Sequence, residues 1–304
     1  MTKTYMNKEP LNIVSVWTRQ IESGQQPSGK DLQEHLSSVH DNNPGFTEAV
    51  AWNCRDINGK NSYELLADTI DKNYHSHVLD LACGSGVLLD LCNRRYGSEL
   101  ELTGVDMNDA ELQLARKRLS HTDIKLHHGL AQDLNFISDS SVDVILCHWA
   151  LTLMDPVVPV LITAKRILKK NGIFAAIIDG DPAKAPGYHE IHNIIYEHVR
   201  REYPNYGEIE LGDPRVRTAD GINELASKTF VDFDITITPL LLNLDESPDK
   251  LAREVSGFFY ASFVLSVDGH SKMLYDLEKY LSSQLQEDLS CFNMPVNLIV
   301  IRHK

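Results

Sequence analysis

The chain has 304 residues, of which 42% are hydrophobic, and a formal net charge of −14 at pH 7. This length can bury one large core or two modest ones, and the acidic balance makes a nucleic-acid substrate an unfavourable electrostatic match. The five cysteines form no CxxC pair, which argues against a structural zinc site and against a disulfide framework. We therefore expect neither a metal nor a nucleic-acid partner.

The sequence also carries no signal for a membrane. Residues 1–6 lack the apolar core of a signal peptide, and no apolar run reaches the roughly 18 residues of a transmembrane helix. These features predict a cytoplasmic protein with reduced thiols and no membrane partner. The sequence does not define the assembly, for which a homodimer is a candidate.

Residues 1–72 are polar and are predicted to form helices joined by loops, as an N-terminal helical lid. Residues 12–22 and 29–39 have the apolar spacing of helices, and residues 62–70 predict a short helix with Ser62 as its N-cap. Three aromatic side chains of this region are expected, from position alone, to cover a bound ligand: Phe46, Trp52 and Tyr63.

From residue 75 short apolar runs alternate with helical stretches. The predicted strands are residues 77–80, 102–106, 124–127, 142–147 and 172–179. The predicted helices between them are residues 87–95, 110–120 and 157–170, the last ending in a cap at Asn171-Gly172. Strands that alternate with helices predict an α/β fold with a parallel, doubly wound sheet.

After Asp179 the alternation is interrupted by helical insertions at about residues 183–228 and 247–290, although residues 73–304 are still expected to form one domain. The helices predicted in the insertions are residues 188–203, 218–228, 248–265 and 271–289. The remaining apolar segments, residues 231–241 and 294–302, are predicted to be strands.

The glycine-rich turn after the first predicted strand indicates a cofactor site. Gly84 and Gly86 can adopt positive φ angles and let a ligand approach the backbone. A dinucleotide site needs a third glycine where this chain has Leu89, and Asp80 would repel a pyrophosphate. The Gly-Lys-Ser/Thr ending of a P-loop is also absent. S-adenosylmethionine fits better, because its ammonium and sulfonium attract a carboxylate; the alternative is an ordinary strand-to-helix turn.

The second predicted strand ends in another acid. Asp106 follows the glycine turn by about 20 residues, where an acid accepts hydrogen bonds from ribose hydroxyls. Met107 is suited to lie against an adenine face. The alternatives are a helix N-terminal acid for Asp106 and a core position for Met107.

Taken in order, these motifs resemble the class I S-adenosylmethionine-dependent methyltransferases. Residues 78–86 resemble the family's first motif, residues 103–106 the second, residues 129–134 the adenine-binding turn, residues 141–147 the fourth strand and residues 166–172 the segment before the fifth. The family often has an acid where this chain has Leu130, so backbone contacts near Ala131, or Gln132, would substitute. The resemblance implies a Rossmann-like sheet of seven strands with the last one antiparallel.

The motifs and the resemblance together imply a set of cofactor-binding residues. These are Asp80, Ala82, Cys83, Gly84, Gly86, Asp106, Met107, Leu130, Ala131, Gln132, Cys147 and Tyr63. At the end of the fourth strand, His148 is the candidate catalytic side chain, as a base or to orient the acceptor, and Trp149 is a candidate pocket wall. A structural histidine and a core tryptophan are the alternatives.

The acceptor is predicted to bind beside the helix at residues 188–203. Tyr188, His192 and Tyr196 share one face of it at four-residue spacing, and Arg215, with Arg217, could clamp a carboxylate. Ordinary helix packing and surface arginines are the alternatives. The sequence thus predicts methyl transfer to oxygen, nitrogen or carbon of a small molecule. The alternatives are a methyltransferase-fold protein with a regulatory or scaffolding role, and a nicotinamide-dependent oxidoreductase.

Overall fold

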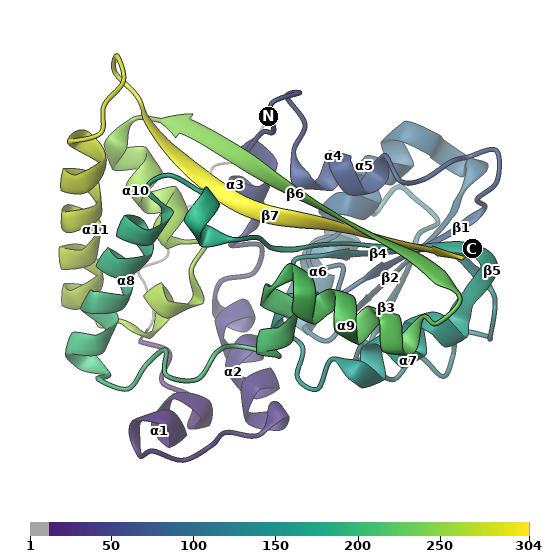
Figure 1. Cartoon of the computed structure of the whole chain (residues 1–304), viewed down its shortest axis with the longest axis horizontal. Coiled ribbons are helices and arrows are strands. Elements are labelled where there is room, and N and C mark those ends of the chain that lie inside the picture. The colour runs from purple at the N-terminus through teal and green to yellow at the C-terminus, as the bar shows by residue number, and fades with distance from the viewer. Residues whose placement is uncertain (1–11, 304) are drawn as a thin grey trace.

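The computed structural model describes residues 12–303, which form a seven-stranded sheet in the order β3-β2-β1-β4-β5-β7-β6 (Figure 1). The strands are β1 His77–Leu81, β2 Glu101–Asp106, β3 Lys125–His128, β4 Val142–His148, β5 Leu168–Asp179, β6 Phe233–Glu246 and β7 Ser290–His303. The neighbouring pairs among β1 to β5 are parallel, and β7 runs antiparallel to both β5 and β6. The predicted doubly wound sheet with an antiparallel last strand is therefore confirmed.

Both faces of the sheet are covered, because successive strand residues point to opposite sides. Along β5, Ile173, Ala175 and Ile177 belong to one core, and Phe174, Ala176 and Ile178 belong to the other. The second core is closed by α7 (Val158–Ile167) and α9 (Ala219–Thr229). The first core contains apolar residues from most of the other helices, among them α5 (Val87–Tyr96), α6 (Asp109–Arg118) and α8 (Tyr188–Glu202).

The N-terminal region packs into that first core through four helices: α1 Val16–Glu22, α2 Gly29–Asn42, α3 Glu48–Asn53 and α4 Ser62–Ala67. Ser15 caps α1, so the helix begins later than the apolar spacing predicted. Asn61 and Glu64 form a capping box at α4, so the prediction of Ser62 as its cap is wrong. The sequence did not predict α3. The predicted absence of a signal peptide concerns residues outside the described range.

Three predicted boundaries were also wrong. The helix predicted to reach residue 170 ends at Ile167, because Leu168 already pairs with Val142 in β4. Gly172 is therefore not a cap but a strand residue, where a Cβ atom would lie 2.9 Å from the Asp143 carbonyl oxygen. The strand predicted to end at residue 241 runs to Glu246, since β6 pairs with β7 along its whole length.

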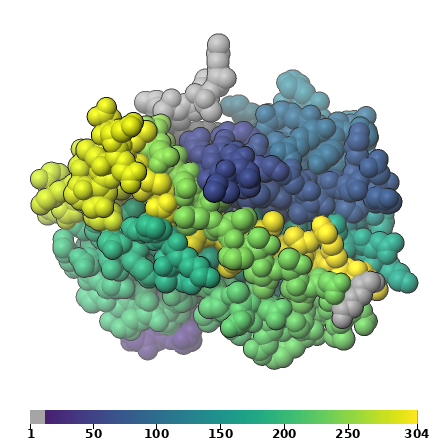
Figure 2. Space-filling view, turned by 45° about the horizontal axis from the view of Figure 1, so that its top comes forward, coloured from purple at the N-terminus to yellow at the C-terminus, as the bar shows by residue number. Residues whose placement is uncertain are grey.

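The helix predicted over residues 248–265 is two separate elements. α10 spans Pro248–Ser256, Gly257 follows it, and a 3₁₀ helix, η5, spans Tyr260–Val264. The last helix, α11, is Val267–Ser282. The insertion helices α8, α10 and α11 gather at one end of the sheet (Figure 1). In the space-filling view the yellow atoms of β7 reach the surface beside β6 (Figure 2).

Candidate functional site

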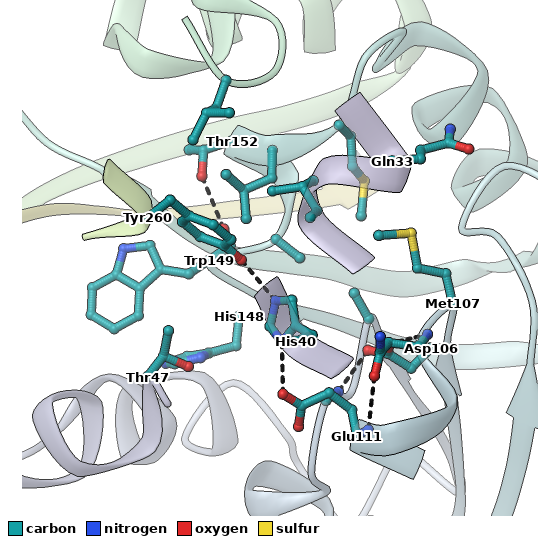
Figure 3. A pocket seen from close by; sticks show the side chains of 18 of the residues that line it. Gln33, His40, Thr47, Asp106, Met107, Glu111, His148, Trp149, Thr152 and Tyr260 are labelled. Carbon is teal, nitrogen blue, oxygen red and sulfur yellow. Dashed lines mark hydrogen bonds and ion pairs between the residues drawn. The ribbon is translucent and has the colours of Figure 1, made fainter. Parts of the chain in front are cut away.

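A cavity of about 480 Å³ lies at the carboxyl ends of the parallel strands (Figure 3). Its wall combines the ends of β1, β2, β4 and β5 with side chains from the N-terminal helices, from residues 188–217 and from residues 258–260. The volume is in the range of small-molecule sites. Ligands of open parallel sheets bind at this edge, so the cavity is the candidate site.

The two glycines of the turn have different roles. A Cβ atom at Gly84, where φ is +49°, would meet only a Glu111 oxygen 3.8 Å away, so the space above this glycine is open for a ligand. A Cβ atom at Gly86, where φ is +77°, would lie 3.1 Å from Ala115 of α6 and from Leu119, which caps the end of that helix. Gly86 therefore allows α6 to pack closely and does not line the cavity.

Asp80 is the most unusual side chain of the site. Its exposed fraction is 1%, and neither carboxylate oxygen has a hydrogen-bond partner within residues 12–303. Burial, reinforced by the Asp106 carboxylate, raises the pKa of Asp80 to about 8. A buried carboxylate without a partner is costly, so the geometry calls for a ligand that carries a cation or strong donors.

Asp106 organises the turn that faces Asp80. One of its oxygens accepts a hydrogen bond from the Gly84 N–H at 2.8 Å, and the other accepts one from the Asn108 N–H at 2.8 Å. Burial raises the pKa of Asp106, and these two hydrogen bonds oppose that rise. Asp106 thus connects the tips of β1 and β2, and the adjacent Met107 lines the cavity.

A chain of hydrogen bonds closes the cavity on the side of α2 (Figure 3). The His40 Nδ1 lies 2.7 Å from a Glu111 oxygen, and its Nε2 lies 2.8 Å from the Tyr260 hydroxyl. The same Glu111 oxygen accepts a hydrogen bond from the Gly45 N–H at 2.8 Å. These contacts join α2, α6 and η5 around the site, and no local sequence signal pointed to them.

A second link ties α3 to the glycine turn. Arg118 donates to Glu48 at 2.7 Å and to the Ser85 carbonyl oxygen at 2.5 Å, and the Ser85 hydroxyl donates to Glu48. Since Glu48 and Ser85 both line the cavity, residues of the N-terminal region are held directly against the turn.

His148 lies at the end of β4, where the sequence places the candidate catalytic group. Its ring stacks on Tyr63 with centroids 3.9 Å apart, and its Nε2 is 2.8 Å from the Ser62 hydroxyl. Burial lowers the pKa of His148 to about 3. The imidazole is therefore neutral at physiological pH. Trp149 follows with φ of 55°, a strained value that non-glycine residues rarely adopt.

The three predicted α8 residues line the far side of the cavity. Tyr188 and His192 have centroids 6.5 Å apart with an interplanar angle of 21°, and His192 stacks on Tyr196 at 4.0 Å. Phe259 meets His192 edge to face at 6.2 Å, and Phe258 meets Trp149 edge to face at 5.2 Å. This part of the cavity wall therefore consists of aromatic side chains that pack against one another.

The arginines next to that wall differ from each other. Arg217 lines the cavity, forms an ion pair with Asp179, donates to the Leu211 carbonyl oxygen at 2.8 Å and lies 3.4 Å from Glu210. Arg215 pairs with Asp213 at 2.6 Å, has a side chain that is 54% exposed and is not part of the wall. The geometry therefore places Arg217, and not the predicted Arg215, at the site.

Most of the other site residues predicted from the sequence line the cavity. The cavity wall includes Asp80, Ala82, Cys83, Gly84, Asp106, Met107, Leu130, Ala131, Gln132, Tyr63, His148, Trp149, Tyr188, His192 and Tyr196. Cys147 is fully buried in the core on the α7 side. Phe46 packs on Tyr260 and Phe263, and Trp52 packs on Tyr63 without lining the cavity.

Two absences hold for the part of the chain that is described. Within residues 12–303 there is no group of three or more His, Cys, Asp and Glu side chains arranged to hold a metal ion. No helix in the same range combines the length and the apolar character needed to cross a membrane.

Comparison with known proteins identifies the central part of the chain. Residues 79–176 match the family model described as a methyltransferase domain. The demethylmenaquinone methyltransferase of Listeria welshimeri is 26% identical over 159 residues, which are 50% of this chain and 66% of that protein. The one of Symbiobacterium thermophilum is 30% identical over 110 residues, 35% of this chain and 43% of that protein. The chain thus spans less than two thirds of the length of these relatives.

Solved structures agree in fold. The Bacillus subtilis YcgJ protein has a TM-score of 0.53 at 17% identity, with 80% of this chain and 98% of that chain covered. Phosphoethanolamine N-methyltransferase 2 of Haemonchus contortus, solved with phosphomonomethylethanolamine and S-adenosylhomocysteine, has a TM-score of 0.52 at 17% identity, with 91% of this chain and 60% of that chain covered. At these identities the likeness is one of fold.

Proposed function

We propose that this chain, which carries a class I S-adenosylmethionine-dependent methyltransferase domain, transfers a methyl group to a small-molecule acceptor. The observation that carries the proposal is Asp80: a buried carboxylate that has no hydrogen-bond partner within residues 12–303, behind a glycine turn that is open at Gly84. A positively charged nucleoside with an amino-acid end supplies the cation and the donors that such a carboxylate requires.

The residues present fit this cofactor. Asp80 and the open turn at Gly84 suit its amino-acid end, Asp106 suits the ribose hydroxyls, and Met107 with residues 130–132 suits the adenine. When bound, the cofactor supplies a methyl carbon attached to a sulfonium, which is a good leaving group. The role of each residue is a proposal based on its place in the cavity wall.

Positioning and exclusion of water are the main contributions of the protein to the reaction. Transfer would form a bond between the acceptor atom and the methyl carbon, would leave the electron pair of the broken carbon–sulfur bond on sulfur, and would release any proton of the acceptor atom to solvent. His148 is a poor general base, since burial lowers its pKa to about 3. Its neutral ring, fixed by Tyr63 and Ser62, instead orients the acceptor. Proximity and desolvation account for the acceleration.

The two other functions fit less well. A nicotinamide dinucleotide would bring its pyrophosphate to the turn beside Asp80, and the third glycine of its motif is Leu89, which is 1% exposed in the core. A regulatory or scaffolding role would leave the part of the cavity that is lined by α8 and by residues 258–259 without use. The candidate homodimer and the cytoplasmic location stay predictions, which light scattering and cell fractionation test.

The deciding experiment is turnover. We expect the purified chain to release S-adenosylhomocysteine from S-adenosylmethionine only when an acceptor pool of small molecules is added. Binding of S-adenosylhomocysteine with no release from any pool would support the regulatory role instead. His148→Gln, with the cofactor affinity as the control, tests whether that side chain acts on the acceptor and not on the cofactor.

A further inference from the structure

The half of the cavity away from the glycine turn indicates which kind of acceptor the protein binds. It is formed by the ends of β4 and β5, by one face of α8, by residues 206–217 and by residues 258–259. The aromatic residues of its wall within the described part of the chain are Trp149, Tyr188, His192, Tyr196, Tyr206, Phe258 and Phe259. We call this part of the cavity the acceptor half.

The charged side chains in the deeper part of the acceptor half are paired with each other. Asp179 and Arg217 form an ion pair inside the wall, and the 58% exposed Glu210 side chain approaches the same guanidinium. The remaining charged side chains of this wall, Asp155 and Arg200, are exposed to solvent, and the Arg200 guanidinium lies over the Tyr196 ring, 5.5 Å from its centroid. Below this solvent-exposed rim, a charged acceptor would find no free counterion among the described residues, and an uncompensated charge buried in such a site is strongly unfavourable.

The histidines of the wall add no charge. Burial lowers the pKa of both His148 and His192, so each imidazole is neutral at pH 7. Tyr206, in contrast, offers an uncharged polar group. It lines the cavity and is 2% exposed, and its hydroxyl has no hydrogen-bond partner within the described residues. Uncharged polar contacts are thus available where charged ones are not.

The arrangement of the rings also disfavours a cationic acceptor. A site for an ammonium turns the faces of several rings toward one point. Here the faces are engaged by other rings, because His192 stacks on Tyr196 and meets the edge of Phe259, while Trp149 meets Phe258. Ring edges and partly covered faces pack best against another π system.

We infer that the methyl acceptor is an uncharged, planar aromatic molecule that packs against the rings of α8 and of residues 258–259. This inference rests on the proposed function. The inference goes beyond small-molecule methyl transfer, because it excludes carboxylate, phosphate and ammonium acceptors. It also explains why Arg217 is tied to Asp179 and not left free to bind an anion.

Three probes with the same ring system test the inference without knowledge of the natural acceptor. At pH 7, 2-naphthol is uncharged, 2-naphthoate is an anion and 2-naphthylmethylammonium is a cation. Each is titrated into the full chain saturated with S-adenosylhomocysteine, and the dissociation constant is measured by calorimetry. We expect 2-naphthol to bind about tenfold or more tightly than either charged probe. Equal or tighter binding of a charged probe would overturn the inference.

Two substitutions locate the bound probe. His192→Ala should weaken 2-naphthol severalfold and leave the S-adenosylhomocysteine affinity unchanged, whereas Arg215→Ala, outside the cavity, should change neither. If His192→Ala disturbs folding, Tyr188→Leu offers a second variant of the same wall with a smaller volume change. An unchanged 2-naphthol affinity in both wall variants would contradict the proposed location. Failure of S-adenosylhomocysteine to bind wild type would instead refute the proposed function, so the two failures are distinguishable.

Discussion

The two halves of the cavity differ in whether their buried charged side chains have partners. In the half at the glycine turn, Asp80 is buried, and neither of its oxygens has a hydrogen-bond partner among the described residues. In the acceptor half, Asp179 is paired with Arg217, and the rings of α8 and of residues 258–259 are part of the wall. A buried charge without a partner indicates a charged ligand, whereas compensated charges indicate a neutral one. The proposed binding of the cationic cofactor in the first half, and of a neutral acceptor in the second, is based on this contrast.

The largest effect is expected from removing the unpaired charge. Asp80→Asn keeps the side-chain size but loses the attraction for the ammonium of the amino-acid end, which S-adenosylhomocysteine and sinefungin both retain, and we expect their binding to weaken by about 2–3 kcal/mol. Calorimetry on wild type and variant measures the difference. Unchanged affinity would remove the distinction between the two halves.

The same carboxyl predicts a dependence on pH. The pKa of Asp80 is raised to about 8 in the folded, ligand-free protein, from an ordinary value of 3.8, so its contribution to stability falls as pH rises from about 4 to 8. The melting temperature of Asp80→Asn, relative to that of wild type, should therefore increase as pH rises over this window. Cofactor affinity of wild type should increase over the same window as the carboxyl ionises, and the variant should lack that increase.

A smaller loss is expected at Asp106. Asp106→Ala removes the acceptor of the Gly84 and Asn108 N–H groups as well as the contact proposed for the ribose, with an expected cost of about 1–3 kcal/mol in cofactor affinity. Asp106→Asn is the matched control, since it retains an oxygen that accepts one of the bonds, and its loss should be smaller. Equal losses of cofactor affinity in the two variants would show that the charge of Asp106, and not its hydrogen bonds, is what the cofactor requires.

The closure at α2 should matter less than the acids of the strand ends. His40→Ala breaks both contacts of the chain that joins Glu111 to Tyr260, and we expect about 1 kcal/mol weaker cofactor binding, seen as a faster dissociation rate. Stopped-flow measurement of cofactor release tests this. A variant with unaltered dissociation would show that α2 does not retain the cofactor.

The smallest effect is expected at a buried group without a partner. Tyr206→Phe removes a hydroxyl that has no hydrogen bond within the described residues, so the melting temperature of the free protein should stay constant or rise slightly. The same variant should bind 2-naphthol more weakly and naphthalene equally well. A clear loss of stability would show that the hydroxyl has a partner in the free protein.

The sequence was most informative where the site is local. Asp80 lies near the end of β1, Gly84 lies in the turn that follows, and Asp106 lies at the tip of the next strand, so a single motif with its spacing pointed to all three. The four-residue spacing of Tyr188, His192 and Tyr196 likewise predicted one wall of the cavity, because helix periodicity puts such residues on the same face.

Contacts between distant segments could not be predicted in this way. His40 is 71 residues from Glu111 and 220 residues from Tyr260 along the chain, so no local pattern connects them. The spacing also could not choose between Arg215 and Arg217, since the choice depends on Asp213 and Asp179 as partners. The same reason explains the length of β6, which its pairing with β7 extends to Glu246.

The most direct test of the account is a calorimetric comparison of S-adenosylhomocysteine with NADH, on wild type and on Asp80→Asn. The account predicts that wild type binds S-adenosylhomocysteine, that the variant binds it much more weakly, and that neither binds NADH. Tight binding of NADH to wild type with no heat from S-adenosylhomocysteine would contradict it.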